Sequence, residues 1–259
     1  MLTGATTIIS ISSTIPYSEK YGRILCYPKY DEDELHKRIE ELKLLGIKSI
    51  EFQGSKTING VKALGKGCVS IVVLAYTDAS KIALKIRRLD SDRDNMLHES
   101  KMLKRANQLG IGPRLFGLSD NFILMEYMEG KLLPAWILQN VRKKLRLRKT
   151  LRNLLIDCLR LDIQKLDHGE LCNASKHVIV KSNGAPVILD FESSSTNRRS
   201  KNVQCICQYL FISSDISGKV KKILGIKNID KLIEALKKYK RNCSRENFER
   251  ILEVTGLAD

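Results

Sequence analysis

Residues 168–192 read HGELCNASKHVIVKSNGAPVILDFE, and this stretch organises the rest of the chain. Two apolar runs, 178–180 and 187–189, flank the pair Asn183-Gly184. Asparagine and glycine both tolerate positive φ angles, and such a pair between apolar runs is a strong hairpin signal. The stretch therefore predicts a β-hairpin with polar residues at its open end.

Three of these polar residues can act together chemically. His168 and Glu170 precede the first strand, and Asp190 follows the second. Because the two ends of a hairpin lie close together, we expect the three side chains to meet in one place. Carboxylates gathered there could handle a phosphate that is bound to a metal ion.

Two motifs in this stretch resemble those of the protein-kinase superfamily. Residues 168–171 are similar to its catalytic loop, and Asp-Phe-Glu at 190–192 is similar to its DFG metal motif. The resemblance implies an α+β, bilobal protein-kinase-like fold that uses ATP and Mg²⁺. It implies a small β-rich N-lobe with one key helix over 56–128 and a reduced, mainly helical C-lobe over 129–259. The remaining residues, 1–55, are interpreted as an N-terminal accessory segment.

Composition and charge narrow the class of partners. The chain has 259 residues, 43% of them apolar, and a formal net charge of +16, which favours nucleotides, RNA or acidic proteins as partners. No apolar run approaches the ~20 residues of a membrane span, so no membrane partner is expected. Seven scattered cysteines without a paired metal-ligand spacing favour reduced thiols in the cytoplasm, with Cys205 and Cys207 in the core.

A glycine pair lies upstream of these motifs. Residues 61–76 predict two strands joined at Gly65-x-Gly67. Glycines there let backbone N–H groups approach a phosphate without interference from a Cβ atom. The segment is similar to the kinase glycine loop, with Ser70 in place of the third glycine. A lone Gly-x-Gly between strands is also typical of a tight hairpin, so both interpretations stay open.

The next strand contains a lysine within an apolar run. Lys85 interrupts the run at 82–86, and a buried lysine is costly unless an anion accompanies it. Glu99 lies on the apolar stripe of the following helix, so we predict a Lys85–Glu99 ion pair. The alternative is a helix-edge Glu99 paired with Lys101 or Lys104. The resemblance implies that Lys85 holds the α- and β-phosphates of ATP.

Helical spacing predicts several further elements. Asp31 resembles an N-cap for a helix that ends at Gly46, and Ser91 is expected to begin the helix that carries Glu99. A long buried helix is predicted near 149–166. The basic run at 142–149 is interpreted as a solvated helix face, with an RNA or acidic-partner site as the alternative.

A hinge is implied after the strand at 122–125. Residues 126–130 are similar to the crossing from the kinase small lobe to the large one. The resemblance implies that backbone groups at Glu126 and Met128 bind the adenine edge, next to an apolar pocket.

The catalytic loop departs from the family pattern. Glu170 stands where kinases have the Asp that orients the acceptor hydroxyl, so the carboxylate reaches one methylene further. Gly169 stands where many protein kinases have an Arg that reads activation-loop phosphorylation, so we expect no control of that kind.

The metal ligands are only partly assigned. The resemblance implies that Asp190 holds Mg²⁺, but the usual second ligand, an Asn, is displaced in this sequence. Asn173, Ser175 and His177 are the candidates, and Asn173 is our assignment. Mg²⁺ prefers oxygen ligands, which makes His177 the least suitable of the three.

The segment after Phe191 is short and rich in serine. It holds no Ala-Pro-Glu sequence, so the platform for peptide substrates is reduced. This pattern resembles the atypical RIO-type and KEOPS-complex kinases, and most closely an archaeal group of predicted serine/threonine kinases. Residues 193–195 are a candidate self-modification site.

Three functions follow from this resemblance. The first is an atypical serine/threonine protein kinase that transfers the γ-phosphate of ATP and phosphorylates itself. The second is a nucleotide-binding pseudokinase that scaffolds a protein or RNA partner. The third is a small-molecule kinase, because a His-Gly-acid loop also resembles aminoglycoside and choline kinases.

Overall fold

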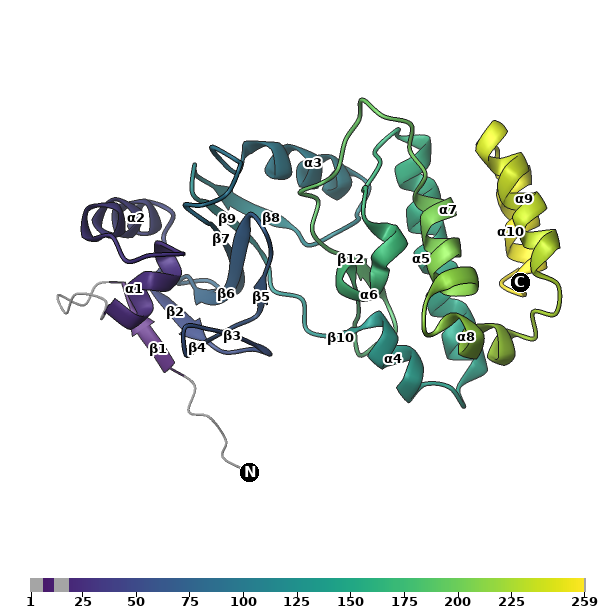
Figure 1. The fold of residues 1–259 in the computed structure, drawn as a ribbon, viewed down its shortest axis with the longest axis horizontal. Helices are drawn as coiled ribbons and strands as arrows, with labels where there is room; N and C mark the ends of the chain where they lie inside the picture. The colour runs from purple at the N-terminus through teal and green to yellow at the C-terminus, as the bar shows by residue number, and fades with distance from the viewer. Residues whose placement is uncertain (1–6, 12–18, 259) are drawn as a thin grey trace. The chain divides into compact units, whose positions relative to one another are not determined.

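The structure is a computed structural model that describes residues 7–11 and 19–258. It has mixed α+β secondary structure, as expected (Figure 1). The chain divides into two compact units. The N-terminal unit comprises residues 1–101 and 114–127, and the C-terminal unit comprises residues 102–113 and 128–259.

An antiparallel sheet forms the centre of the N-terminal unit. Among the described residues it has seven strands in the order β1-β2-β6-β7-β9-β8, with β5 paired to β6. Its strands are β1 (Thr7–Ser10), β2 (Ser49–Phe52), β5 (Gly65–Lys66), β6 (Ser70–Tyr76), β7 (Lys81–Arg87), β8 (Leu115–Leu118) and β9 (Phe122–Glu126). A separate ladder pairs β3 (Lys56–Ile58) with β4 (Val61–Ala63). The expected accessory segment thus supplies β1 and β2 to the same sheet as β6 and β7.

Helix α2 (Glu32–Leu44) fastens this first segment to the sheet, whereas α1 (Glu19–Leu25) is a short helix before it. The predicted N-cap is confirmed, because the Asp31 side chain accepts a hydrogen bond from the backbone N–H of Glu34. Arg38 is fully buried on the inner face of α2. Its guanidinium donates to the carbonyl of Arg87 at 2.7 Å and to Asn121 Oδ1 at 2.9 Å, which joins α2 to β7 and to the turn before β9.

Helix α3 (Leu97–Gln108) begins later than predicted. The expected start at Ser91 is wrong: the Ser91 hydroxyl donates to the Arg93 carbonyl within a bend. The side chain of Asn95 instead accepts from the N–H of Leu97 at 3.0 Å and supplies the local start signal. The predicted end is confirmed at Gly110, which has a φ of 67°.

The C-terminal unit is mainly helical (Figure 1). It also holds a three-stranded sheet in the order β10-β11-β12 among its described residues. Its strands are β10 (Lys131–Leu132), β11 (Val178–Val180) and β12 (Pro186–Ile188). Its helices are α4 (Leu133–Gln139), α5 (Lys144–Ile163), the 3₁₀ turn η1 (Leu171–Asn173), α6 (Ala174–His177), α7 (Asn202–Cys207), the π-helical turn η2 (Gln208–Ser213), α8 (Ser217–Leu224), α9 (Ile229–Arg241) and α10 (Arg245–Val254).

The basic run at 142–149 lies mostly inside α5, which begins at Lys144 rather than near residue 149. Residues 142–145 and 149 are exposed, in keeping with a solvated face, and two arginines of the run also have partners within the unit. Arg148 Nη2 donates to the carbonyl of Ala258 at 2.7 Å. The guanidinium of Arg146 lies 5.8 Å from the centroid of the Trp136 ring and also donates to Ser182.

The predicted hairpin is confirmed as β11 and β12, which pair in antiparallel register. Gly184 has a φ of 89°, whereas Asn183 does not use the left-handed region. The Asn183 side chain instead accepts from the N–H of Ala185 at 2.9 Å. The Thr150 hydroxyl of α5 donates to the Gly184 carbonyl at 2.8 Å and anchors the turn to the core of the unit.

The expectation of reduced thiols is wrong for one pair of cysteines. Cys172 in η1 and Cys205 in α7 form a disulfide that joins segments 33 residues apart in sequence. The predicted burial of Cys205 and Cys207 is confirmed. The described residues include the other cysteines, which are unpaired: Cys26, Cys68, Cys158, Cys207 and Cys243.

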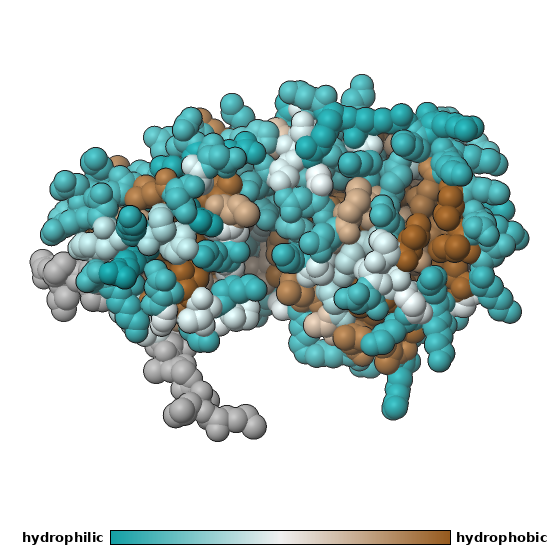
Figure 2. All heavy atoms as spheres, in the orientation of Figure 1, coloured by the Kyte–Doolittle hydropathy of each residue, from teal (hydrophilic) through white to brown (hydrophobic). Residues whose placement is uncertain are grey.

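Hydrophilic side chains cover most of the face shown in Figure 2, in keeping with the 45 lysines and arginines of the chain. Within the described ranges, no helix combines the length and the apolar character that crossing a bilayer requires.

Candidate functional site

The open end of the β11–β12 hairpin gathers the predicted polar residues around His177. Its Nε2 atom lies 3.0 Å from Glu170 Oε2, and its Nδ1 atom lies 3.7 Å from Asp190 Oδ2. The imidazole is 8% exposed, while the side chains of Glu170 and Asp190 are 43% and 39% exposed. The site therefore presents two accessible carboxylates on either side of a buried ring.

His168 supports this site from beneath. It is fully buried, its Nε2 atom donates to the Leu189 carbonyl at 2.9 Å, and its ring meets Phe191 edge-on at 5.1 Å. Burial lowers the pKa of His168 from 6.5 to about 4. The imidazole is therefore neutral at physiological pH, and we interpret His168 as a positioning residue rather than a proton donor.

A second polar network holds the loop at residues 168–171 from the helical side. Asn202 Oδ1 accepts from the backbone N–H of His168 at 2.9 Å, and its amide donates to Asp162 at 2.8 Å. Asp162 also accepts from the Tyr239 hydroxyl at 3.1 Å. Burial raises the pKa of Asp162, and these hydrogen bonds oppose the rise. The sequence offered no local signal for this network, because its members are dozens of residues apart.

Asp190 has an unusual backbone conformation. Its φ is 67°, in the left-handed region that non-glycine residues rarely adopt and that costs on the order of 1 kcal/mol. The neighbouring residues fix it in place: the N–H of Leu189 donates to the His177 carbonyl, and Phe191 is buried. Backbone strain that the surrounding contacts hold in place in this way is concentrated at functional sites.

The carboxylate of Glu170 also contacts a serine that follows the hairpin. The Ser193 hydroxyl donates to Glu170 Oε1. Arg198 Nη2 donates in turn to the carbonyl of Ser193, and its Nε donates to Asp167. The sequence carries no signal for Arg198, and it does not distinguish Ser193 from the serines beside it.

Gly169 is required by the position of Arg198. Its φ is 92°, and a Cβ atom added there would lie 2.2 Å from Arg198 Nη2 and 2.7 Å from the Ser193 carbonyl oxygen. The volume that a side chain at residue 169 would fill is thus occupied by the guanidinium of Arg198, which lies 29 residues later in the sequence.

The assignment of Asn173 as the second metal ligand stays a prediction. The Asn173 side chain is exposed and accepts from the Ser175 hydroxyl at 2.6 Å. It is His177, the least suitable of the three candidates, that lies beside Asp190. The oxygen donors near this position within the C-terminal unit are the carboxylates of Asp190 and Glu192, which are two residues apart.

The N-terminal unit contains the predicted ion pair. Lys85 Nζ lies 2.7 Å from Glu99 Oε1, and the two residues are 3% and 5% exposed. Lys85 stands opposite Val72 of β6 and Ile123 of β9, so its strand is covered by neighbours on both edges. Glu99 is thus a buried partner of Lys85 rather than a helix-edge residue.

Gly65 and Gly67 form a tight hairpin, one of the two predicted alternatives. Gly65 pairs with Val72, and the N–H of Gly67 donates to the Ser70 carbonyl at 2.8 Å. Neither glycine has a positive φ, and added Cβ atoms would meet nothing closer than 3.8 Å at Gly65 and 3.7 Å at Gly67. Nothing within the unit requires glycine at these positions, so their role toward a phosphate stays a prediction.

The predicted hinge residues lie at the end of β9 and just after it. The backbone N–H of Glu126 donates to the Arg114 carbonyl at 2.8 Å, and Met128 is 8% exposed. Their binding to adenine stays a prediction.

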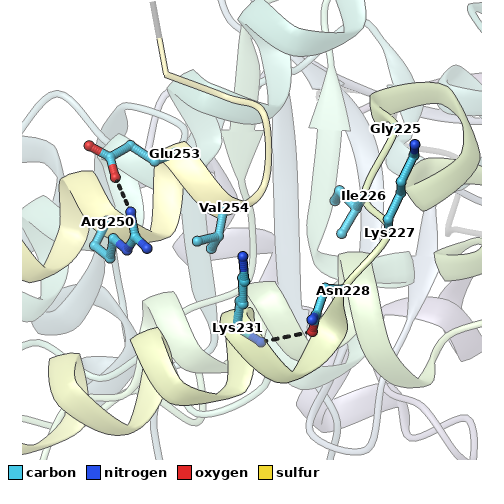
Figure 3. Close-up of a pocket in the computed structure, with 8 residues that line it drawn as sticks. All are labelled: Gly225, Ile226, Lys227, Asn228, Lys231, Arg250, Glu253 and Val254. Atoms are coloured by element: carbon cyan, nitrogen blue, oxygen red, sulfur yellow. Dashed lines mark hydrogen bonds and ion pairs between the residues drawn. The ribbon is translucent and has the colours of Figure 1, made fainter.

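A basic pocket lies elsewhere in the C-terminal unit, and it is lined by residues of α9, α10 and the turn after α8 (Figure 3). Its volume is about 300 Å³. The N–H of Lys231 donates to Asn228 Oδ1 at 3.2 Å, and Arg250 pairs with Glu253 at 2.7 Å. The first contact caps α9, and the second gives Arg250 an anionic partner. The predicted site residues are not among the described residues that line the pocket.

No protein-family model and no curated protein matches this sequence. Evidence for a function therefore comes from the geometry within each unit.

Proposed function

We propose that this protein is an ATP- and Mg²⁺-dependent serine/threonine protein kinase of a bilobal, protein-kinase-like fold. The observation that carries the proposal is the Lys85–Glu99 ion pair at 2.7 Å. Burying two charges costs several kcal/mol per ion before their attraction offsets it, so such a pair is weak evidence for stability alone. A lysine held in this way, on a strand beside a glycine turn, suits the binding of a triphosphate.

The N-terminal unit would bind the nucleotide. Lys85 would contact the α- and β-phosphates, and Glu99 would keep the ammonium group oriented toward them. Added Cβ atoms at Gly65 and Gly67 would meet no close neighbour, so the backbone of this turn leaves space for a phosphate to approach. The remaining contacts would come from Gly65, Gly67, Glu126 and Met128.

The C-terminal unit would carry out the transfer. The carboxylates of Asp190 and Glu192 suit a hard divalent cation, and bound Mg²⁺ would neutralise charge on the β- and γ-phosphates. Glu170 would orient the acceptor hydroxyl and accept its proton. His177 would hold the carboxylates of Glu170 and Asp190 at a set separation, because its ring contacts both. Positioning and charge neutralisation would supply most of the rate.

Phosphate transfer from radiolabelled ATP to a mixture of serine and threonine peptides tests the proposal. Lys85→Ala and Asp190→Asn should each abolish transfer. Lys81→Ala is the matched control, because Lys81 is exposed on the same strand as Lys85. Indistinguishable transfer by wild type, Lys85→Ala and Asp190→Asn would reject the enzymatic function.

One observation favours a second function, that of a pseudokinase scaffold. His177 lies beside Asp190, where a kinase of the ordinary pattern would place an oxygen ligand for its second metal ion. ATP binding without turnover, together with RNA binding that weakens as salt increases, would favour this alternative.

A further inference from the structure

We propose that Ser193 is the internal acceptor of this kinase, and that the chain phosphorylates its own Ser193 within one molecule. The inference rests on the proposed function and names the substrate hydroxyl of that site. Its basis is the hydrogen bond from the Ser193 hydroxyl to Glu170 Oε1. A general base must be within hydrogen-bond reach of the proton that it removes, and Ser193 meets this condition in the folded chain.

The other oxygen of Glu170 strengthens the assignment. Glu170 Oε2 lies 3.0 Å from His177 Nε2, so the carboxylate is held between the imidazole and the Ser193 hydroxyl. Three side chains thus form a continuous hydroxyl–carboxylate–imidazole chain. This arrangement orients the carboxylate toward one hydroxyl and leaves little freedom for another serine of the same segment.

The neighbouring serines have different partners. The Ser194 side chain is buried, and its hydroxyl donates to the carbonyl of His168 at 3.2 Å. The Ser195 hydroxyl accepts from the N–H of Asn197 at 3.1 Å. The Ser193 hydroxyl, for its part, donates to the carboxylate of Glu170.

The backbone holds Ser193 in this position from both sides. On one side, the N–H of Ser194 donates to the carbonyl of buried Phe191 at 3.1 Å. On the other, Ser195 and Asp167 exchange two backbone hydrogen bonds, at 2.8 and 2.9 Å. The acceptor therefore sits on a short segment fastened at both ends, which lowers the entropy cost of reaching the transition state.

A cation is already present to stabilise the product. Arg198 Nη2 donates to the Ser193 carbonyl, so a phosphate on Ser193 would carry its negative charge close to a guanidinium. Arg199 follows and is exposed. The carboxylate of Glu170 would lose its hydroxyl partner at the same time, and like charges would push the phosphate away from it.

Ser193 Oγ forms a bond to the γ-phosphorus of ATP, while the bond from that phosphorus to the bridging β,γ-oxygen breaks. ADP leaves with the electron pair of the broken bond. The hydroxyl proton passes to Glu170, which releases it to solvent.

Phosphosite mapping by mass spectrometry, after incubation of the full chain with ATP and MgCl₂, tests the inference. We expect phosphate on Ser193, with a first-order rate constant that is the same in dilute and concentrated protein. Ser193→Ala should lose this phosphate, Ser193→Thr should give phosphothreonine at residue 193, and Ser195→Ala should keep the wild-type product. Glu170→Gln should slow the reaction by roughly a hundredfold, the size of a general-base contribution.

Two further measurements separate this inference from the proposed function. Thermal unfolding of each variant shows whether it folds, and Ser193→Thr retains the hydroxyl if Ser193→Ala does not fold. Transfer to peptides that depends on Lys85 and Asp190, with Ser193 unmodified, would overturn the inference and leave the kinase function standing. Phosphate on Ser193 that appears faster in concentrated protein would overturn the intramolecular step. No transfer to any acceptor would overturn both.

Discussion

Lys85 Nζ lies 2.7 Å from Glu99 Oε1, between a strand and a helix, with both side chains almost wholly out of contact with solvent. Glu99 thereby fixes the position of the Lys85 ammonium group beside its strand. Pre-positioned charge costs no reorganisation when a charged ligand arrives.

Removal of either partner should destabilise the protein. Lys85→Met or Glu99→Gln takes away the counter-charge of a buried group, and such changes cost about 3–5 kcal/mol of unfolding free energy. The double variant should cost less than the sum of the single variants, because it leaves no buried charge from this pair. Urea unfolding of the four proteins measures the coupling. Additive single effects would show that the pair contributes no mutual stabilisation.

Local patterns in the sequence predicted much of the fold. The N-cap at Asp31, the helix end at Gly110 and the hairpin at Gly184 are each signalled within a few residues. The Lys85–Glu99 pair was predicted across a longer separation, because a lysine in an apolar strand requires an anion and the next helix places one on its buried face. A long-range pair can be predicted in this way when one residue, such as a buried lysine, requires a partner of opposite charge.

Long-range partners cannot be predicted when neither residue requires the other. No sequence pattern indicates that Arg198 fills the space beside Gly169, and none indicates that Cys172 forms a disulfide with Cys205. The start of α3 was also missed, since several residues that favour caps compete before it. There the tertiary hydrogen bond from the N–H of Met96 to the Asp120 carbonyl, at 3.2 Å, helps to set where the helix begins.

Arg38 provides a second stability prediction. It is fully buried and donates to Glu34 at 2.7 Å, to Asn121 and to backbone carbonyls. Arg38→Met should cost about 3 kcal/mol or more, because it leaves buried acceptors without a donor. Arg38→Lys should rescue little, since an ammonium group cannot reproduce the planar fork. Lys37→Met is the exposed control on the same helix, and equal unfolding free energies for the two methionine variants would contradict the assignment.

The disulfide predicts a difference in cysteine alkylation. Under denaturing conditions without reductant, Cys172 and Cys205 should be protected and five cysteines should react. After reduction all seven should react. Cys172→Ser should give the same number of adducts with and without reductant. Intact mass spectrometry counts the adducts, and seven on the unreduced wild type would support reduced thiols instead.

His168 predicts a loss of stability in mild acid. Its pKa is lowered to about 4 by burial, whereas the unfolded chain protonates near the ordinary value of 6.5. Between these values the unfolded state binds more protons, so stability from this group falls as the pH falls from about 6.5 to about 4. The loss across that window is roughly 3 kcal/mol.

A comparison of variants isolates this effect. Asp157 has a pKa raised by burial to about 6 and acts in the opposite direction, so the wild-type curve alone is not diagnostic. His168→Gln should flatten the pH dependence of the urea midpoint between pH 7 and 4.5 relative to wild type, while exposed His36→Gln should leave it unchanged. Parallel curves for wild type and His168→Gln would show that His168 does not titrate in this window.

Gly169 offers the sharpest local test of the site. Gly169→Ala combines a φ of 92° with a Cβ that would lie 2.2 Å from Arg198 Nη2 and 2.7 Å from a backbone oxygen. The arginine can move aside but the backbone cannot, so we expect a loss of more than about 1 kcal/mol. Gly218→Ala in α8 is the matched control, because an added Cβ meets nothing within 4 Å and alanine favours the helix by roughly 0.5–1 kcal/mol. Arg198→Ala should relieve part of the loss in the double variant if the guanidinium is the main obstacle. An unchanged loss would assign the strain to the backbone and to the Ser193 carbonyl.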